Sequence, residues 1–185
     1  METLRRKIEQ YIPKCEQEEY DKALMLEYMT KNDDVLLRSN TAAHFSASAW
    51  VVNKDRSRVL MVYHNIYDSW SWTGGHADGE SDLLSVAVRE VKEETGITLA
   101  VPVFEDIFSL EVLTVDGHIK NGRYVSSHLH LNVSYLIEAD EQEVLHIKPD
   151  ENKGVRWFSL DEAMEAVSEK WMKKWIYKKL INRIK

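Results

Sequence analysis

The chain has 185 residues, 44% of them hydrophobic and 30% charged, and a formal net charge of −7. These values fit one folded domain with a helical annex, exclude disorder of the whole chain, and argue against a nucleic-acid-binding surface. The single cysteine, Cys15, excludes an intramolecular disulfide framework and any cysteine-based zinc or iron–sulfur site.

Residues 1–38 are predicted to form a helical N-terminal extension, because apolar residues recur there at helical spacing. Leu4 and Ile8 begin the pattern, and Tyr20, Leu24 and Tyr28 continue it in a second helix. This extension could cover a pocket, pack on a sheet or build a homodimer. The start has no apolar core of signal-peptide type and no run of 18 apolar residues exists, so we expect a cytoplasmic location and no membrane span.

Residues 39–185 are predicted to form the main domain, of α+β class. A strong helix is predicted at 82–95, where Gly96 follows as a C-terminal cap, and another opens at Ser159, which forms a capping box with Glu162. Strands are predicted at 47–52, 59–63, 101–113, 128–137 and 155–158.

The last segment, residues 170–185, carries seven Lys or Arg and no acid. Its apolar residues recur at helical spacing: Trp171, Met172, Trp175, Ile176, Leu180, Ile181 and Ile184. A basic amphipathic helix of this kind either binds an anionic membrane or nucleic acid, or packs on its own domain with lysine stems along the surface. We favour packing.

The helix at 82–95 carries the most informative residues. Glu90, Glu93 and Glu94 stand at i, i+3 and i+4, so three carboxylates share one face, and Arg89 lies four residues before Glu93. The three negative charges repel one another, and a cation bound between them relieves this repulsion. Carboxylate oxygens are hard ligands, which suit Mg²⁺ or Mn²⁺. The alternative is a solvated acidic face.

A glycine-rich loop leads into this helix. Four of the seven glycines of the chain lie between Gly74 and Gly96, and Gly74, Gly75 and Gly79 surround His76. Glycines allow a tight turn that directs backbone groups at a ligand, and a helix N-terminus favours anions such as phosphate. A plain turn explains the loop alone equally well, but a glycine loop followed by three carboxylates indicates a metal-bridged phosphate site.

Gly75 through Ile97 resembles the signature of the Nudix (MutT-like) hydrolases, G-x5-E-x7-R-E-U-x-E-E-x-G-U, where U is apolar. Gly75 and all positions from Arg89 to Ile97 match. The pattern departs once, because the first glutamate is Glu80 and Ser81 stands where the signature has it.

The resemblance implies an α/β/α sandwich with a mixed sheet, and hydrolysis of a nucleoside diphosphate linked to another group, with Mg²⁺ or Mn²⁺. It implies that Glu90, Glu93 and Glu94 bind the metal, together with the carbonyl of Gly74. The general base would be Glu90 or, from a separate loop, Glu151. An exposed loop acid is the alternative reading of Glu151.

Candidate substrate contacts are Gly75, His76 and two sets of residues that alternate along predicted strands, one of three residues and one of two. His128, His130 and Asn132 share one strand face, where they line a pocket or simply bond within the sheet surface. A zinc site from the two histidines lacks a clear third ligand. Trp70 and Trp72 also alternate and could stack on a base, although core packing of at least one is favoured.

Two other functions remain open. The Trp72–His76 segment also resembles isopentenyl-diphosphate isomerases, but those enzymes use a cysteine in this loop and the only cysteine here is Cys15. A catalytically silent ligand sensor is the other alternative, although the signature glutamates are retained.

Overall fold

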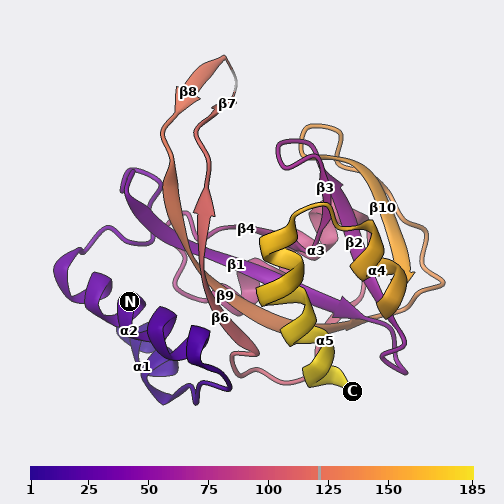
Figure 1. Cartoon of the computed structure of the whole chain (residues 1–185), viewed down its shortest axis with the longest axis horizontal. Coiled ribbons are helices and arrows are strands. Elements are labelled where there is room, and N and C mark those ends of the chain that lie inside the picture. The colour runs from indigo at the N-terminus through magenta and orange to yellow at the C-terminus, as the bar shows by residue number, and fades with distance from the viewer. Residues whose placement is uncertain (121) are drawn as a thin grey trace. The chain divides into compact units, whose positions relative to one another are not determined.

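The computed structural model describes residues 1–120 and 122–185. Its helices, shown in Figure 1, are α1 (Glu2–Gln10), α2 (Glu16–Lys31), α3 (Leu83–Thr95), α4 (Leu160–Ala166), the π-helical segment η1 (Met172–Tyr177) and α5 (Lys178–Ile184). Its strands are β1 (Ala43–Val52), β2 (Arg58–His64), β3 (Ser69–Ser71), β4 (Thr73–His76), β5 (Ala100–Pro102), β6 (Ser109–Val115), β7 (His118–Lys120), β8 (Arg123–Val125), β9 (His128–Ala139) and β10 (Asn152–Ser159).

The chain divides into two compact units, each of them built from three segments. The first comprises Met1–Ala47, Gly75–Val86 and Asp106–Tyr135, and the second comprises Ser48–Gly74, Ala87–Glu105 and Leu136–Lys185. The N-terminal helices therefore share a unit with β6, β7 and β8. Among the described residues, no helix is both long and apolar enough to cross a membrane.

In the first unit, α2 packs against strand β6, which is the second of the three roles considered for the extension. The side chain of Gln17 donates to the carbonyl of Leu110 at 3.0 Å, and Asp21 accepts from the amide of Val112 at 2.8 Å. These bonds satisfy backbone groups of β6 that its partner strand β9 does not. Figure 1 shows α1 and α2 beside β6, and the β7–β8 hairpin extending beyond it.

The predicted apolar face of α2 is wrong, although the helix itself is confirmed. Tyr20 is 71% exposed and Leu24 is 40% exposed, whereas Met25 and Met29 are buried. A neighbouring face of the helix, which carries Asp21, Met25 and Met29, is turned inward instead. The polar bonds to β6 include Glu18, which is fully buried and accepts from Ser109 at 2.7 Å.

In the second unit, β2 is paired on both edges. It pairs antiparallel with β1 in the register Val51↔Leu60, which confirms the predicted hairpin, and antiparallel with β10 and β3. Strand structure predicted over 101–113 is present at both ends of this range but interrupted in the middle: β5 ends at Pro102 and β6 begins at Ser109. Proline cannot donate to the ladder, so the strand stops there.

The helix predicted at 82–95 is confirmed as α3, and Gly96 ends it. Gly96 has a φ of +78°, a conformation that side-chain-bearing residues rarely adopt, and a Cβ there would lie 2.8 Å from the ring of His146. Both observations require glycine at this position.

The predicted capping box at α4 is present. The hydroxyl of Ser159 accepts from the amide of Glu162, whose carboxylate accepts from the amide of Ser159. We expect Ser159→Ala to cost about 1 kcal/mol, because an orphan amide loses its partner. Thermal unfolding should show a midpoint lowered by about 2–4 °C. Ser168→Ala, beyond the helix, is the comparison, and an equal midpoint for the Ser159 variant and the wild type would contradict the assignment.

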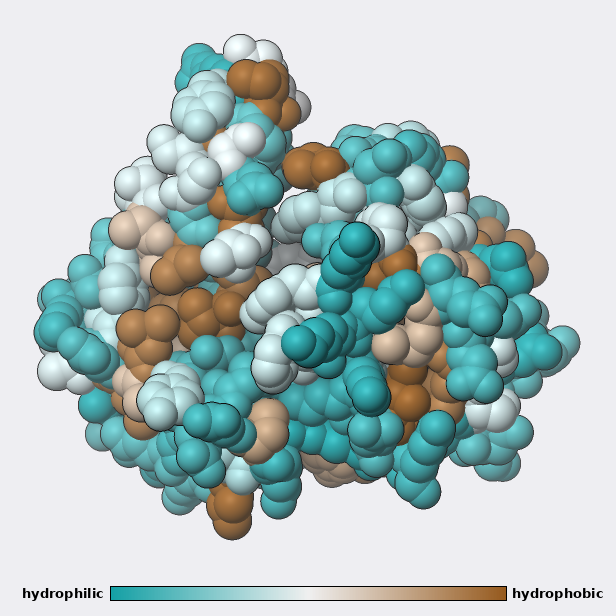
Figure 2. All heavy atoms as spheres, viewed as in Figure 1, coloured by the Kyte–Doolittle hydropathy of each residue, from teal (hydrophilic) through white to brown (hydrophobic). Residues whose placement is uncertain are grey.

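The C-terminal stripe packs on its own unit, as favoured above, but not along its whole length. Ile176, Leu180, Ile181 and Ile184 are buried, whereas Trp171 and Trp175 are 47% and 46% exposed. The wider π-helical turns of η1 shift the phase of the stripe, which a regular 3.6-residue period does not anticipate. Figure 2 shows mostly hydrophilic side chains on the outer surface of α5.

Candidate functional site

Three carboxylates of the second unit converge. Glu90 and Glu94 lie one turn apart on α3, and Glu151 lies immediately before β10. One carboxylate oxygen from each lies within 4.8 Å of the others. We call this group the acidic cluster. Its spacing on α3 is the one the sequence predicts, and its third member comes from the separate loop.

Glu94 is the most firmly held member of the acidic cluster. It is 2% exposed, and its carboxylate accepts from the amide of Gly74 at 2.8 Å. The fully buried Asn152 donates from its side chain to the backbone carbonyl of Glu94 at 2.9 Å. Burial raises the pKa of the Glu94 carboxyl well above its usual range, although the Gly74 amide opposes this.

Glu90 is half-buried, and its pKa is raised by burial first and then by the charges of Glu93 and Glu151. The charges of Lys148 and Arg89 oppose this rise in the pKa of Glu90 but do not cancel it. The two buried carboxyl groups therefore favour further positive charge. A hard divalent cation with oxygen ligands supplies it, so the donor set fits Mg²⁺ or Mn²⁺.

Glu93 does not join this cluster. Its half-exposed carboxylate lies 3.1 Å from the ammonium of Lys148 and 4.0 Å from the guanidinium of Arg89. Lys148 also lies 3.2 Å from Glu151. Although burial opposes it, hydrogen bonds to Glu93 and Glu151 raise the pKa of Lys148. Lys148 and Asn152 are not predicted as site residues; in the sequence they are marked only by their position on either side of Glu151.

Trp70 and Trp72 are packing residues of the second unit. Trp72 is 7% exposed and meets Tyr177 edge to face at 5.6 Å between ring centroids. Trp70 packs edge to face on Tyr63 and Phe158. Trp72 is therefore a core residue, whereas Trp70 is only half-buried.

The first unit contains a second group of metal-ligating side chains. His76, His128 and His130 converge with His44, which the sequence analysis missed, and one ring nitrogen of each lies within 4.8 Å of the others. We call these four residues the histidine cluster. Burial is the main factor that lowers the pKa of His76 to about 3 and that of His130 to about 2. Their rings are therefore neutral at physiological pH.

Asn132 and Gly75 lie elsewhere in the first unit. Asn132 is buried, donates to Glu111 and to Ser134 at 3.0 Å each, and accepts from Ser46 at 3.0 Å. Its side chain therefore holds neighbouring strands together. Gly75 lies in β4, half-buried, directly before His76.

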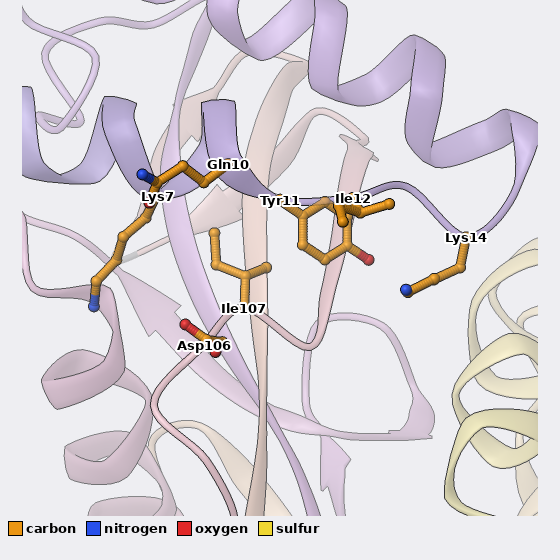
Figure 3. A pocket seen from close by; sticks show the side chains of 7 residues that line it. All are labelled: Lys7, Gln10, Tyr11, Ile12, Lys14, Asp106 and Ile107. Atoms are coloured by element: carbon orange, nitrogen blue, oxygen red, sulfur yellow. The ribbon is translucent and has the colours of Figure 1, made fainter.

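A pocket of about 290 Å³ lies in the first unit between α1, the segment that follows it, and residues Asp106 and Ile107 (Figure 3). Lys7, Tyr11 and Lys14 also line it. None of its lining residues belongs to the acidic cluster or the histidine cluster.

Comparison with protein families and curated proteins gives one consistent result. The NUDIX domain model matches residues 42–179. The bis(5'-nucleosyl)-tetraphosphatase of Rattus norvegicus is 31% identical over 106 residues, which cover 56% of this chain and 65% of that enzyme. The same enzyme of Sus scrofa is 31% identical over 117 residues, covering 62% of this chain and 72% of its own. The chain thus spans slightly less than two thirds of the rat enzyme.

Solved structures share the fold at lower identity. An Ap4A hydrolase of C. elegans in a binary complex has a TM-score of 0.52 at 20% identity, covering 75% of this chain and 93% of its own. The dihydroneopterin triphosphate pyrophosphohydrolase of E. coli has a TM-score of 0.56 at 16% identity, covering 75% and 95%. The α+β fold expected from the sequence signature is therefore confirmed.

Proposed function

The chain belongs to the Nudix hydrolase family, and on that premise we propose that it is a metal-dependent pyrophosphohydrolase. Its substrate would be a nucleoside diphosphate linked to another group, or a related small diphosphate, and its cofactor Mg²⁺ or Mn²⁺. The observation that carries the proposal is the convergence of Glu90, Glu94 and Glu151, two of them on the signature helix.

The residues have separate tasks in this proposal. Glu90, Glu94 and Glu151 hold the cation, which when bound activates water and neutralises phosphate charge. The Gly74 amide and Asn152 fix the position of Glu94. Glu90 and Glu151 are the two candidates that accept the proton of the attacking water. Arg89 and Lys148 keep the carboxylate of Glu93 turned to them.

The decisive experiment is a hydrolysis screen across a diphosphate library with product identification. The library contains a dinucleoside tetraphosphate, after the substrate named for the relatives, as well as nucleoside triphosphates, ADP-ribose and non-nucleotide diphosphates. We expect cleavage of a pyrophosphate bond with Mg²⁺, loss of the activity in EDTA, and its return with excess Mg²⁺ or Mn²⁺.

Three outcomes would contradict the proposal. Turnover that persists in EDTA would show that the hydrolysis does not depend on a metal ion. Isomer formation from isopentenyl diphosphate, without hydrolysis of any library member, would favour the isomerase that the glycine loop also resembles. Ligand binding without turnover of any member would favour a sensor.

A further inference from the structure

The histidine cluster belongs wholly to the first unit and shares no residue with the acidic cluster, although the sequence predicts His76, His128 and His130 as substrate contacts. His44 comes from β1, His76 ends β4, and His128 and His130 share one face of β9. Backbone bonds hold these segments together: the amide of Ala77 donates to Phe45 at 3.0 Å, and the amide of Leu129 donates to Ala42 at 3.0 Å. The cluster is therefore built by the fold rather than by chance contacts of flexible side chains.

The ring nitrogens are arranged as metal ligands are. His44 is 4% exposed, its Nδ1 lies 2.9 Å from the carbonyl of Asn40, and its buried Nε2 has no hydrogen-bond partner. His128 shares the first of these features, with Nδ1 2.8 Å from the carbonyl of Ser126, while its Nε2 faces Nε2 of His130. A backbone carbonyl that holds one ring nitrogen as a donor leaves the lone pair of the other directed at a metal, which is the usual support of a metal-bound histidine.

The spacing agrees with this reading. The Nε2 atoms of His128 and His130 lie 3.3 Å apart. Two imidazoles on one tetrahedral zinc ion, at about 2.0–2.1 Å each, have nitrogens about 3.3–3.4 Å apart. The ring nitrogens of the other pairs lie within 4.8 Å of one another.

The chemistry of the donors selects the ion. Neutral imidazoles suit zinc and other late first-row divalent metals, whereas Mg²⁺ and Ca²⁺ require oxygen ligands. Two charged residues beside the cluster, Arg38 and Asp78, form a two-point ion pair with each other, with Nε of Arg38 2.6 Å from Asp78. The cluster is thus neither anionic nor suited to a hard cation.

We propose that His44, His76, His128 and His130 form a zinc-type metal site, separate from the Mg²⁺ or Mn²⁺ site of the acidic cluster. The structure supplies the third and fourth ligands that the sequence alone did not provide for His128 and His130. With four protein ligands, the site has the closed coordination of a structural metal centre that ties β1, β4 and β9 together.

The test is Zn²⁺ titration of the chelator-stripped full chain by calorimetry, with excess Mg²⁺ present to occupy the acidic cluster. We expect one tight Zn²⁺ site in the wild type, and affinity lowered more than about 100-fold in His130→Ala and in His76→Ala. His118→Ala, in the same unit but outside the cluster, and Glu94→Gln should bind Zn²⁺ as the wild type does. Circular dichroism verifies that each variant is folded.

Co²⁺ provides a second readout that does not depend on activity. Tetrahedral imidazole coordination gives visible absorption in the wild type, and this absorption should disappear in His130→Ala. Equal Zn²⁺ affinity in the wild type and both cluster variants would overturn the proposal. So would binding of inorganic phosphate, without Zn²⁺ binding, that is lost in His130→Ala, because the histidines would then be substrate contacts.

Discussion

Glu94→Gln should lower the rate of substrate hydrolysis by about 10³-fold or more, which is the scale expected when a buried catalytic charge is removed. Glutamine keeps the shape of the side chain and an oxygen that can still accept from the Gly74 amide at the observed 2.8 Å distance. It removes the charge that the cation requires. Steady-state kinetics at saturating Mg²⁺ measure the effect, and the loss should fall on kcat more than on KM.

Glu93→Gln is the matched control, since Glu93 lies one residue away on the same helix. Its carboxylate is turned to Lys148 and Arg89 and is half-exposed, so we expect a loss of less than about tenfold, as for a screened surface charge. Equal losses of activity for the two variants would contradict the assignment of Glu94, and not Glu93, to the metal-binding acidic cluster.

The unfolding temperature of Glu94→Gln shows whether its loss of activity comes from the lost charge or from misfolding. The pKa of Glu94 is raised in the folded state, so the folded chain binds more protons than the unfolded chain above the unfolded pKa. In the metal-free protein this carboxyl therefore destabilises the fold increasingly as the pH rises through its folded pKa. Metal-free Glu94→Gln should unfold at no lower temperature than the wild type at neutral pH. A lower midpoint would mean that inactivity reflects misfolding.

The acidic cluster was only partly predictable from the sequence. Helical spacing places Glu90 and Glu94 on one face from local geometry alone. The same spacing also includes Glu93, because position on a helix does not reveal which carboxylate meets a lysine from elsewhere in the chain. Glu151 lies 57 residues after Glu94, and only the pairing of β10 with β2 carries it to a defined place.

The histidine cluster and the orientation of α2 depend still more on tertiary structure. The alternation of His128 and His130 is visible in the sequence, but His44 stands in an unremarkable apolar strand, and no periodic signal joins it to β9. For α2, apolar spacing favours Tyr20 and Leu24, whereas hydrogen bonds from Gln17 and Asp21 to β6 decide which face is buried. Backbone groups that need partners here prevail over side-chain hydrophobicity.

Tyr177 of the C-terminal segment packs against residues of β1 and β3 in the second unit. Tyr177 is 1% exposed, and its ring stacks on the fully buried Trp50 with centroids 5.5 Å apart. Its hydroxyl lies 3.1 Å from the hydroxyl of Ser71 and accepts from the amide of Trp72 at 3.4 Å. Two residues further on, the amide of Gly74 holds Glu94. The basic segment therefore supports the strand that positions the acidic cluster.

Tyr177→Ala should cost about 3–5 kcal/mol of unfolding free energy, because it leaves a cavity against Trp50 and removes both polar contacts. Tyr177→Phe, which keeps the ring, should cost only about 1 kcal/mol for the lost hydrogen bonds. Denaturant unfolding followed by tryptophan fluorescence measures both. If Tyr177→Ala unfolded like the wild type while the chain bound anionic vesicles, the segment would be a surface-binding helix. If the segment instead packs within the second unit, Tyr177→Ala must lower the unfolding free energy much more than Tyr177→Phe does.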